Sequence, residues 1–476
     1  MVRKGTISAI LCTTAAVVLA SVAVSSYAGH KDLVNQFDKT IKQVTSITQD
    51  AVSRLTASSD KPKTSEIVVS EATTSAADEV RTVKKIEKVL PSSSKTEKNV
   101  AVTSKSTSRQ YTPVKQQECY LALKSKAARS IYRLIGDNVN WISEQKSDSG
   151  YYPIRTITYS GDVTETEIQL GMLAYLDDNP QVFWVAGVYG FSKHNGKTDI
   201  QLFSVLSPNE CIAMQKKLDS AVSKVISSIP SGLSEFAREE YLFHYLASHC
   251  VYDSAATQSS GNWQPFSACG PLISGKAVCE GYSRAMQLLA GRVGINCTLV
   301  YGWHNGVGHM WNEIQIDGSW YHLDLTWCDN SMLIYNYFNV TDSVIKKSHQ
   351  ISQLYSELSK DQLKSESVSF NFVLHNCNSV RDNYFRKRGI PVSSATNAKD
   401  QNIINQLVPL IKAGKTTAVF LIQDNFNATV QKMGSGELSQ WLLRAALAAG
   451  KKPNSVEVKY VPDQYNSGVT ATFSFH

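Results

Sequence analysis

Three residues whose side chains could carry out thiol chemistry follow one another in the middle of the sequence. Cys279 stands just ahead of an apolar helical pattern, and His309 and Asp324 lie in two later apolar stretches. A cysteine, a histidine and an acid can act together as a nucleophile, its general base and the group that orients the base. The alternative is a buried structural cysteine followed by two ordinary strands. The elements that position the three residues decide between these interpretations.

The element that carries Cys279 is predicted to be a helix. Apolar residues recur at helical spacing after the cysteine, at Tyr282, Ala285, Met286, Leu289 and Val293. Cys279 would therefore stand at or next to the N-terminus of this helix. There the helix dipole favours a thiolate, and amide N–H groups without a helical partner can bind an oxyanion.

A predicted β-hairpin places the other two residues. The segments HMWNEIQI and SWYHLDLTW flank Asp317-Gly318, a pair that favours a two-residue turn. In that register His309 and Asp324 are diagonal neighbours on one face, roughly 7–8 Å apart at the backbone. A shift by one residue would place them on opposite faces. Proximity to the cysteine requires the helix to pack on this sheet, with residues 295–303 as the connecting strand.

The same segments resemble the transglutaminase-like superfamily, whose core has the papain-like cysteine-enzyme fold. The resemblance rests on GKAVCEGYSRAMQLLAGRVGI, GHMWNEIQIDGSWYHLDLTWCD and NYFNVTD, preceded by FHYLASHCVYD, and is close to secreted bacterial members. These motifs cover about residues 236–345, and YLDDNPQVFW resembles more weakly an accessory region beside such cores. The resemblance implies Cys279 as nucleophile, His309 as base and Asp324 as orienting acid. It also implies acyl transfer through a thioester, either to water (peptidase or amidase) or to an amine (cross-linking).

Further site residues are less well defined by the sequence. Papain-like enzymes often supply an oxyanion-hole side chain upstream of the cysteine, and Gln264 and Trp263 are the available donors, although no motif fixes either. Tyr282 and Trp311 are candidates for substrate binding, but both types of residue are also common in cores.

A metal centre is the main chemical alternative to thiol catalysis. His304, His309, His322 and Asp324 could act as metal ligands, because His322 shares a face with Asp324. The order of thiol, helix and hairpin explains more of the sequence, and no acidic calcium loop is present. We therefore expect no metal and no cofactor.

Two classes of function remain open. The first is a thiol enzyme, a cysteine peptidase or protein-glutamine acyltransferase that acts on protein or peptide substrates, with cell-wall peptides as one candidate. The second is a binding or scaffolding protein at the cell surface that retains the fold without turnover. The sequence does not determine the oligomeric state.

The charge distribution argues against a nucleic-acid partner. The net charge is +7, of which residues 1–29 contribute +2, and residues 30–115 hold fifteen Lys/Arg against ten Asp/Glu. The remaining residues sum to about zero, which disfavours a body that binds nucleic acid. The basic arm could be attracted weakly to an anionic cell surface.

The N-terminus has the pattern of an export signal. A basic start, an apolar stretch over roughly Ile7–Val24 and Ser26-Tyr27-Ala28 predict a signal peptide cleaved after about Ala28. An uncleaved membrane anchor is the alternative. We expect a secreted or extracytoplasmic protein.

Export would permit disulfides. Outside the signal lie eight cysteines, at positions 119, 211, 250, 269, 279, 297, 328 and 377. If Cys279 is a free nucleophile, seven remain, so at least one more is unpaired or pairs between chains. The sequence contains no CxxC motif, which disfavours a thiol-redox site or a zinc ribbon.

The expected fold class is α+β. We predict a papain-like, transglutaminase-like core, in which the helix bearing the cysteine packs on an antiparallel sheet, flanked by two small α+β domains. After NYFNVTD a polar helical stretch is expected up to about Ser365, and VSFNFVLHN is expected to open the C-terminal domain as a strand. The predicted boundaries are a signal peptide over 1–28, a Ser/Thr/Lys-rich tether over 29–115 with a short helix at 33–55, an accessory domain over 116–230, a catalytic domain over 231–365 and a C-terminal domain over 366–476.

Overall fold

The computed structural model describes residues 84–85, 99–102, 111–258, 262–329, 332–363 and 369–476. The predicted signal peptide and the predicted helix at 33–55 lie outside the described residues. All described residues belong to one compact unit, Thr73–His476. In the part of the chain that the structure describes, no helix combines the length and apolarity needed to cross a membrane.

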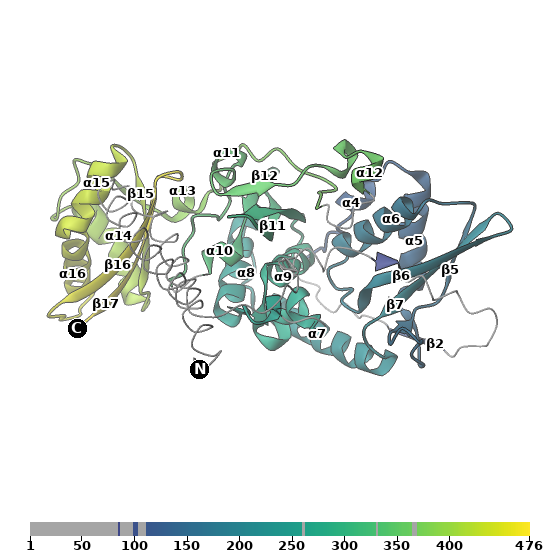
Figure 1. The fold of residues 1–476 in the computed structure, drawn as a ribbon. Coiled ribbons are helices and arrows are strands. Elements are labelled where there is room, and N and C mark those ends of the chain that lie inside the picture. The colour runs from purple at the N-terminus through teal and green to yellow at the C-terminus, as the bar shows by residue number, and fades with distance from the viewer. Residues whose placement is uncertain (1–83, 86–98, 103–110, 259–261, 330–331, 364–368) are drawn as a thin grey trace, which may run out of the picture. The chain divides into compact units, whose positions relative to one another are not determined.

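An N-terminal α+β layer precedes the region of Cys279 (Figure 1). Its helices are α4 (Glu118–Ala122), α5 (Lys126–Asn138), α6 (Glu165–Asp178) and α7 (Pro208–Ser228). Its main sheet has the order β1-β6-β7-β4, with β5 also paired to β7. These strands are β1 (Lys84–Lys85), β4 (Tyr152–Pro153), β5 (Ile157–Ser160), β6 (Val185–His194) and β7 (Lys197–Ser204), and β2 (Asn99–Ala101) pairs separately with β3 (Trp141–Ser143).

The accessory layer begins earlier in the chain than the sequence analysis predicts. Within the predicted tether, Lys84–Lys85 pairs in parallel with β6, and Asn99–Ala101 pairs with β3. Strand addition at a sheet edge uses backbone hydrogen bonds, so it does not require the apolar pattern that this segment lacks. The predicted boundary at residue 115 is therefore wrong for these two segments.

Local sequence signals explain where the helices start. Thr164 and Ser207 begin α6 and α7 with capping boxes, closed by Glu167 and Glu210 respectively. These reciprocal bonds satisfy amide groups that have no partner within the helix. Helix α9 differs, because its first cap residue is Val278, which has no capping side chain.

The central part of the chain forms a helix-on-sheet layer. It contains α8 (Glu235–His249), α9 (Cys279–Arg292), α10 (Leu325–Cys328), α11 (Asp342–Ile345) and α12 (Lys360–Leu363). Its antiparallel sheet has the order β12-β11-β10-β13, with strands β10 (Cys297–His304), β11 (Val307–Ile316), β12 (Ser319–Leu323) and β13 (His349–Ile351). The short strands β8 (Val251–Tyr252) and β9 (Lys276–Ala277) pair in parallel just before α9.

The predicted hairpin and its register are confirmed. Ile316 pairs with Ser319 and Asn312 pairs with Leu323 across β11 and β12. Both turn residues, Asp317 and Gly318, have positive φ angles of 46° and 81°. This conformation is the type I′ turn that the Asp-Gly pair favours, and it fixes which side chains share a face.

The C-terminal α+β layer has its own sheet, in the order β14-β15-β17-β16. Its elements are α13 (Tyr384–Arg388), β14 (Ile390–Val392), α14 (Gln401–Lys412), β15 (Thr417–Ile422), α15 (Phe426–Lys432), α16 (Leu438–Ala448), β16 (Val456–Asp463) and β17 (Gly468–Phe475). Two predictions near its start are wrong. The stretch expected to be helical up to about Ser365 contains strand β13, and residues 369–376 of VSFNFVLHN form only an isolated bridge, between Asn371 and Leu354. Both segments pair or pack with distant parts of the chain, so local periodicity predicted them poorly.

The hydrophobic cores follow a different division from the predicted domains. One large cluster runs from Val102 through the accessory and central layers and includes Tyr384, Phe385 and Val419 of the C-terminal layer. A second cluster lies within the C-terminal layer, from Ile390 to Phe473. The expected boundary near residue 230 is therefore not marked by a separate core.

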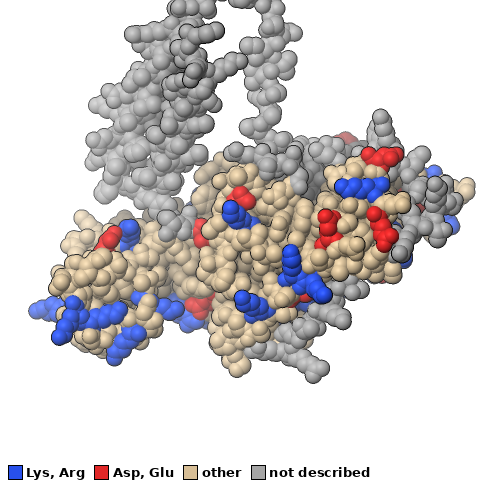
Figure 2. All heavy atoms as spheres, turned by 90° about the horizontal axis from the view of Figure 1, so that it is seen from below, with Lys and Arg blue, Asp and Glu red and all other residues tan. Residues whose placement is uncertain are grey.

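The near-neutral body contains one basic region. Residues 369–476 hold twelve Lys/Arg and six Asp/Glu, and the face shown in Figure 2 has Lys and Arg side chains gathered over the C-terminal elements. The sequence analysis places the excess of basic residues in the arm, and this is incomplete. The net charge of the body is near zero because acidic residues elsewhere in it offset the basic residues of 369–476.

A glycine in β10 allows β13 to approach, and its replacement gives a first prediction. A Cβ atom at Gly302 would overlap the carbonyl oxygen of Gln350 and the ring of Trp311. We expect Gly302→Ala to lower the free energy of unfolding by about 1–3 kcal/mol, the usual cost of overpacking. Urea unfolding of the full chain measures this change. A variant as stable as the wild-type protein would contradict the close packing of β13 on β10.

Candidate active site

Helix α9 places Cys279 against the central sheet. Cys279 is the first residue of the helix and is 5% exposed, in a small apolar cluster with Leu299, Tyr301 and Met310. The Ser283 hydroxyl, one turn later, donates to the carbonyl oxygens of Cys279 at 2.9 Å and of Met310 at 3.1 Å. The packing of the helix on the sheet, which the sequence analysis required, is confirmed.

A buried charge network ties the same helix to the accessory layer. The Arg284 side chain lies 2.7 Å from Glu280, the residue after the cysteine, and 3.3 Å from Asp177 of α6. The Arg284 side chain also donates to the carbonyl oxygen of Leu176 at 3.0 Å. Tyr301 of β10 donates its hydroxyl proton to the same Asp177 carboxylate at 2.9 Å. The accessory layer therefore holds the start of α9 in place.

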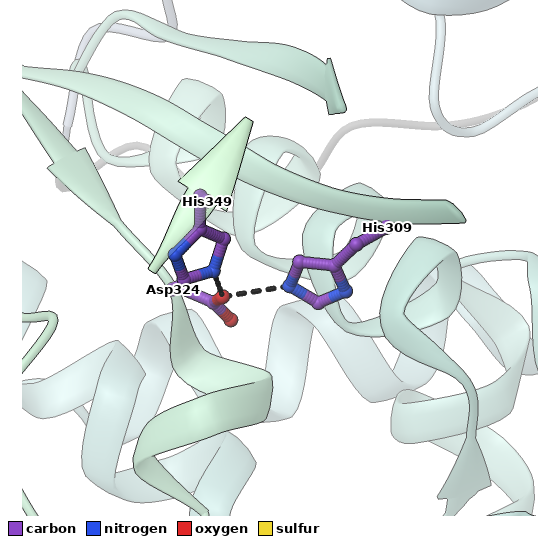
Figure 3. Close-up of side chains that lie close together, drawn as sticks. All are labelled: His309, Asp324 and His349. Carbon is purple, nitrogen blue, oxygen red and sulfur yellow. Dashed lines mark hydrogen bonds and ion pairs between the residues drawn. The ribbon is translucent and has the colours of Figure 1, made fainter. Parts of the chain in front are cut away.

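His309 and Asp324 lie side by side at the end of the hairpin. The Nε2 atom of His309 donates to Oδ2 of Asp324 at 2.7 Å (Figure 3). Strand β12 ends at Leu323 because Asp324 turns the chain and caps α10, where its Oδ1 accepts the Trp327 N–H at 3.1 Å. The predicted diagonal neighbours are therefore in direct contact, and Asp324 is completely buried.

A second histidine, which sequence reasoning missed, shares the same carboxylate oxygen. The Nε2 atom of His349 donates to Oδ2 of Asp324 at 3.0 Å (Figure 3). On its other side, Nδ1 of His349 is 2.9 Å from the Ser348 hydroxyl. The only sequence signal was a histidine in a polar stretch that we predicted to be helical, and nothing local pointed to Asp324.

The electrostatics of this cluster favour a charged His309. Burial alone would lower the pKa of His309, but the Asp324 carboxylate and then the Cys279 side chain, which also hydrogen-bonds to it, raise this pKa to about 10. Burial would raise the pKa of Asp324, but the charge and hydrogen bond of His309, with the hydrogen bond of His349, hold it well below its usual range. Since Nε2 of His309 is bonded to Asp324, Nδ1 is the nitrogen left for the thiol.

A third histidine in the cluster is expected to remain neutral. Burial, followed by the charges of His349 and His309, lowers the pKa of His304 to about 4. Its ring centroid lies 3.9 Å from that of Trp327, which is 36% exposed. Trp327 therefore forms part of the surface beside this cluster.

The candidate oxyanion donors differ in what the structure allows. The ring of Trp263 is stacked on Phe183 of the accessory layer, with centroids 5.2 Å apart, so this side chain serves packing. Gln264 begins a short 3-10 turn that lies against the start of α9, where the carbonyl oxygen of Pro265 accepts the Val278 N–H at 3.1 Å. Gln264 stays a prediction as an oxyanion donor.

The two candidate substrate-binding residues are buried. Tyr282 is 1% exposed and its hydroxyl donates to Asp329 at 2.7 Å, while Trp311 is fully buried and its Nε1 donates to His322 at 3.1 Å. Neither ring can contact a substrate in this conformation, because each is enclosed and its polar atom is bonded. Tyr252 is a better candidate: it is 46% exposed, and desolvation of its hydroxyl, then the charges of Cys279 and Asp324, raise its pKa.

The four residues considered as metal ligands do not come together as one set. Among the described residues, two groups of three side chains place ligand atoms within 4.8 Å of one another: His309, Asp324 and His349 form one, and Glu313, His322 and Cys377 form the other. His322 bonds to Asp342 at 2.9 Å as well as to Trp311, so both of its ring nitrogens have hydrogen-bond partners.

The eight cysteines that the structure describes form no disulfide with one another, and all eight are buried. Burial raises the pKa of six of them: Cys211, Cys250, Cys269, Cys297, Cys328 and Cys377. A raised pKa leaves little thiolate at neutral pH, so these six are expected to react slowly with alkylating reagents.

Residues 225–325 match the family model of the Transglutaminase-like superfamily. The chain thus contains a transglutaminase-like domain, and the predicted fold class, an α+β protein with a papain-like core of this type, is confirmed. The matched range includes Cys279, His309 and Asp324, whereas His349 lies beyond it.

Similar proteins cover only part of the chain. The kyphoscoliosis peptidases of Mus musculus and Homo sapiens are each 25% identical over 142 residues, which is 27% of this chain and 21% of theirs. The chain therefore spans about a fifth of the length of these curated relatives. A solved structure described as a TGase is 17% identical, with a TM-score of 0.22, over 36% of this chain and 50% of that one.

Proposed function

We propose that the transglutaminase-like domain of this chain is a thiol enzyme that forms a Cys279 thioester with peptide or protein substrates. The observation that carries this proposal is the buried His309 imidazole, which bonds to Asp324 at 2.7 Å and whose pKa is raised by Asp324 and by the neighbouring Cys279. The start of α9 lacks a capping side chain, so its amide groups are available to stabilise negative charge. Cys279 would be the nucleophile, His309 the acid and base, and Asp324 the orienting group.

The proposed reaction proceeds in two balanced steps. The sulfur of Cys279 attacks the carbonyl carbon of an amide, and the new C–S bond pushes an electron pair onto the carbonyl oxygen. As the C–N bond breaks, the His309 imidazolium gives its proton to the leaving amine or ammonia, which leaves a thioester. Water or a second amine then gives a proton to His309 and attacks the thioester carbon, and the sulfur leaves as a thiolate.

The group that accepts the acyl chain determines the type of reaction. Transfer to water makes the enzyme a peptidase or amidase, and transfer to an amine makes it a cross-linking acyltransferase. We further propose that the enzyme acts outside the cytoplasm, on proteins or cell-wall peptides. The apolar N-terminal pattern supports this location, and the basic arm and basic C-terminal layer support weak attraction to anionic surfaces.

The pH dependence of Cys279 alkylation tests the proposal without requiring a known substrate. An ordinary thiol is roughly 0.3% ionised at pH 6, because its pKa is about 8.5. If His309 stabilises a thiolate, iodoacetamide should label Cys279 of the full chain about 10–100-fold faster at pH 6 than an ordinary thiol. Mass spectrometry locates the label and separates Cys279 from the other cysteines.

The His309→Ala variant is the necessary comparison. We expect this change to return Cys279 to slow labelling at pH 6, because no imidazole then accepts the thiol proton. Equal labelling rates in the wild-type and variant proteins would argue for a structural cysteine. The search would then turn to partners of a non-catalytic scaffold.

A further inference from the structure

We propose that His349 is a positioning residue for the reaction of Cys279, acting by holding the Asp324 carboxylate and by sharing the oxygen that His309 uses. This inference rests on the proposed thiol chemistry, because it assigns a role within the same site. His349 contacts Asp324 and not the reacting atoms, so it acts through another residue.

The carboxylate of Asp324 is held by three donors. Its Oδ2 accepts from His309 at 2.7 Å and from His349 at 3.0 Å, while its Oδ1 accepts the Trp327 amide at 3.1 Å. Because the residue is fully buried, these bonds replace the water that would otherwise solvate the charge. His349 supplies one of the two side-chain bonds, and this bond prevents the carboxylate from turning about its Cβ–Cγ axis.

Strand β13 delivers His349 to this position. It pairs with the edge of β10 so that His349 stands opposite His304 and Ile351 stands opposite Gly302. The side chain of His349 is fully buried, and its ring centroid lies 5.0 Å from that of Trp311. A side chain so tightly enclosed has few alternative rotamers, so its bond to Asp324 is preorganised.

Sharing one oxygen between two imidazoles has a chemical consequence. A hydrogen bond from His349 lowers the electron density that Asp324 offers to His309, so the His309 imidazolium is less strongly stabilised than by an unshared carboxylate. An imidazolium that holds its proton too tightly is a poor acid toward the leaving amine. His349 therefore weakens the hold of His309 on its proton while it keeps the Asp324 carboxylate, and through it His309, oriented.

The other groups around this pair do not provide the same bond. His304 faces His349 at a centroid distance of 4.7 Å, and its lowered pKa leaves it neutral. Cys279 and Tyr252 face His309 and Asp324 from α9 and β8, and Ser348 bonds to the far side of His349. In the described part of the chain, His349 is thus the second side chain bonded to the shared oxygen.

Two substitutions separate a positioning role from a purely structural one. His349→Phe keeps an aromatic ring of similar size but removes the N–H donor, and His349→Gln places an amide N–H near the position of Nε2. His375→Phe is the matched control, because His375 also bonds to a carboxylate on this sheet, at 2.8 Å from Glu313, but makes no contact with His309 in the structure. All variants are made in the full chain.

The readout is the pH profile of iodoacetamide labelling at Cys279. In His349→Phe we expect the inflection of the labelling rate at which His309 loses its proton to move to higher pH, by on the order of one pH unit. We expect the labelling rate on the plateau below this inflection to fall about tenfold. His349→Gln should restore most of both quantities, and His375→Phe should match the wild-type protein. A His349→Phe profile that superimposes on the wild-type profile overturns the inference and leaves the proposed function standing.

A wild-type protein without fast labelling at pH 6 would overturn both the proposed function and this inference. Should His349→Phe fail to fold, nitrogen NMR of the imidazoles in the wild-type chain carries the test, with His349→Gln used for assignment. We expect Nε2 of His349 to be protonated at neutral pH and its proton resonance to shift in Asp324→Asn. An unprotonated Nε2 overturns the inference.

Discussion

Replacing Cys279 with alanine should lower acyl transfer by a factor of about 10⁴–10⁶, because the covalent route through the thioester is then closed. The side chain is small and buried, so the variant should fold like the wild-type chain. Two assays of the full chain measure the effect: release of ammonia and amines from glutamine-containing and cell-wall-type peptides, and incorporation of dansylcadaverine into casein. The relative rates in the two assays also report whether water or an amine is the preferred acceptor.

Cys211→Ala serves as the matched control for this variant. Cys211 is also a fully buried free thiol, but it lies on α7, and burial raises its pKa. We expect its replacement to leave both reactions within about twofold of wild type, apart from any loss of stability. Turnover that survives in Cys279→Ala would refute a thioester mechanism at Cys279.

Replacing Asp324 with asparagine should lower turnover by about 10²–10⁴-fold although the side chain has the same shape. Three N–H groups point at the two oxygens of Asp324, from His309, His349 and Trp327. An asparagine must place its NH₂ group at one of these oxygen positions, where a donor faces a donor. The imidazole of His309 then loses its orientation, its charge partner or both.

The same substitution has a defined effect on stability across pH. The pKa of His309 is raised from 6.5 to about 10 in the folded chain, so its contribution is complete below pH 6.5 and is lost as the pH rises through 10. The pKa of Asp324 is depressed, so its contribution is complete above pH 3.8 and is lost only at strongly acidic pH. The loss of unfolding free energy in Asp324→Asn should therefore be largest between about pH 4 and 6.5, on the order of 3 kcal/mol, and should shrink toward pH 10.

Urea unfolding of both proteins at pH 5.5, 7.5 and 9.5 measures this trend. Asp342→Asn is the matched control, since Asp342 bonds to His322 at 2.9 Å on the same sheet but does not touch His309. It should reduce turnover little. If the difference in unfolding free energy between the wild-type protein and Asp324→Asn grows with pH, the assignment of His309 and Asp324 as a charged pair is contradicted.

The sequence determined the elements whose rules are local. Helical spacing after Cys279 predicted α9, and the Asp317-Gly318 turn predicted both the hairpin and its register, because two-residue turns leave the flanking strands few alternatives. From that register alone, His309 and Asp324 could be placed on one face. The two substrate-binding candidates, Tyr282 and Trp311, were chosen by residue type alone, and both are buried. A large aromatic side chain suits a core as well as a binding surface, so its type does not distinguish the two.

Only the tertiary structure decided how the site is completed. His349 reaches Asp324 because β13 adds to the edge of β10, and a three-residue strand carries too little periodicity to be recognised against a polar helical pattern. The strands at Lys84–Lys85 and Asn99–Ala101 were not predicted either, because they are similarly short. Both pair through their backbones with partners far along the chain. Local chemistry thus fixed the nucleophile, the base and the acid as candidates. Long-range strand pairing and the burial that it creates decided which groups surround the acid, and therefore how strongly the base is charged.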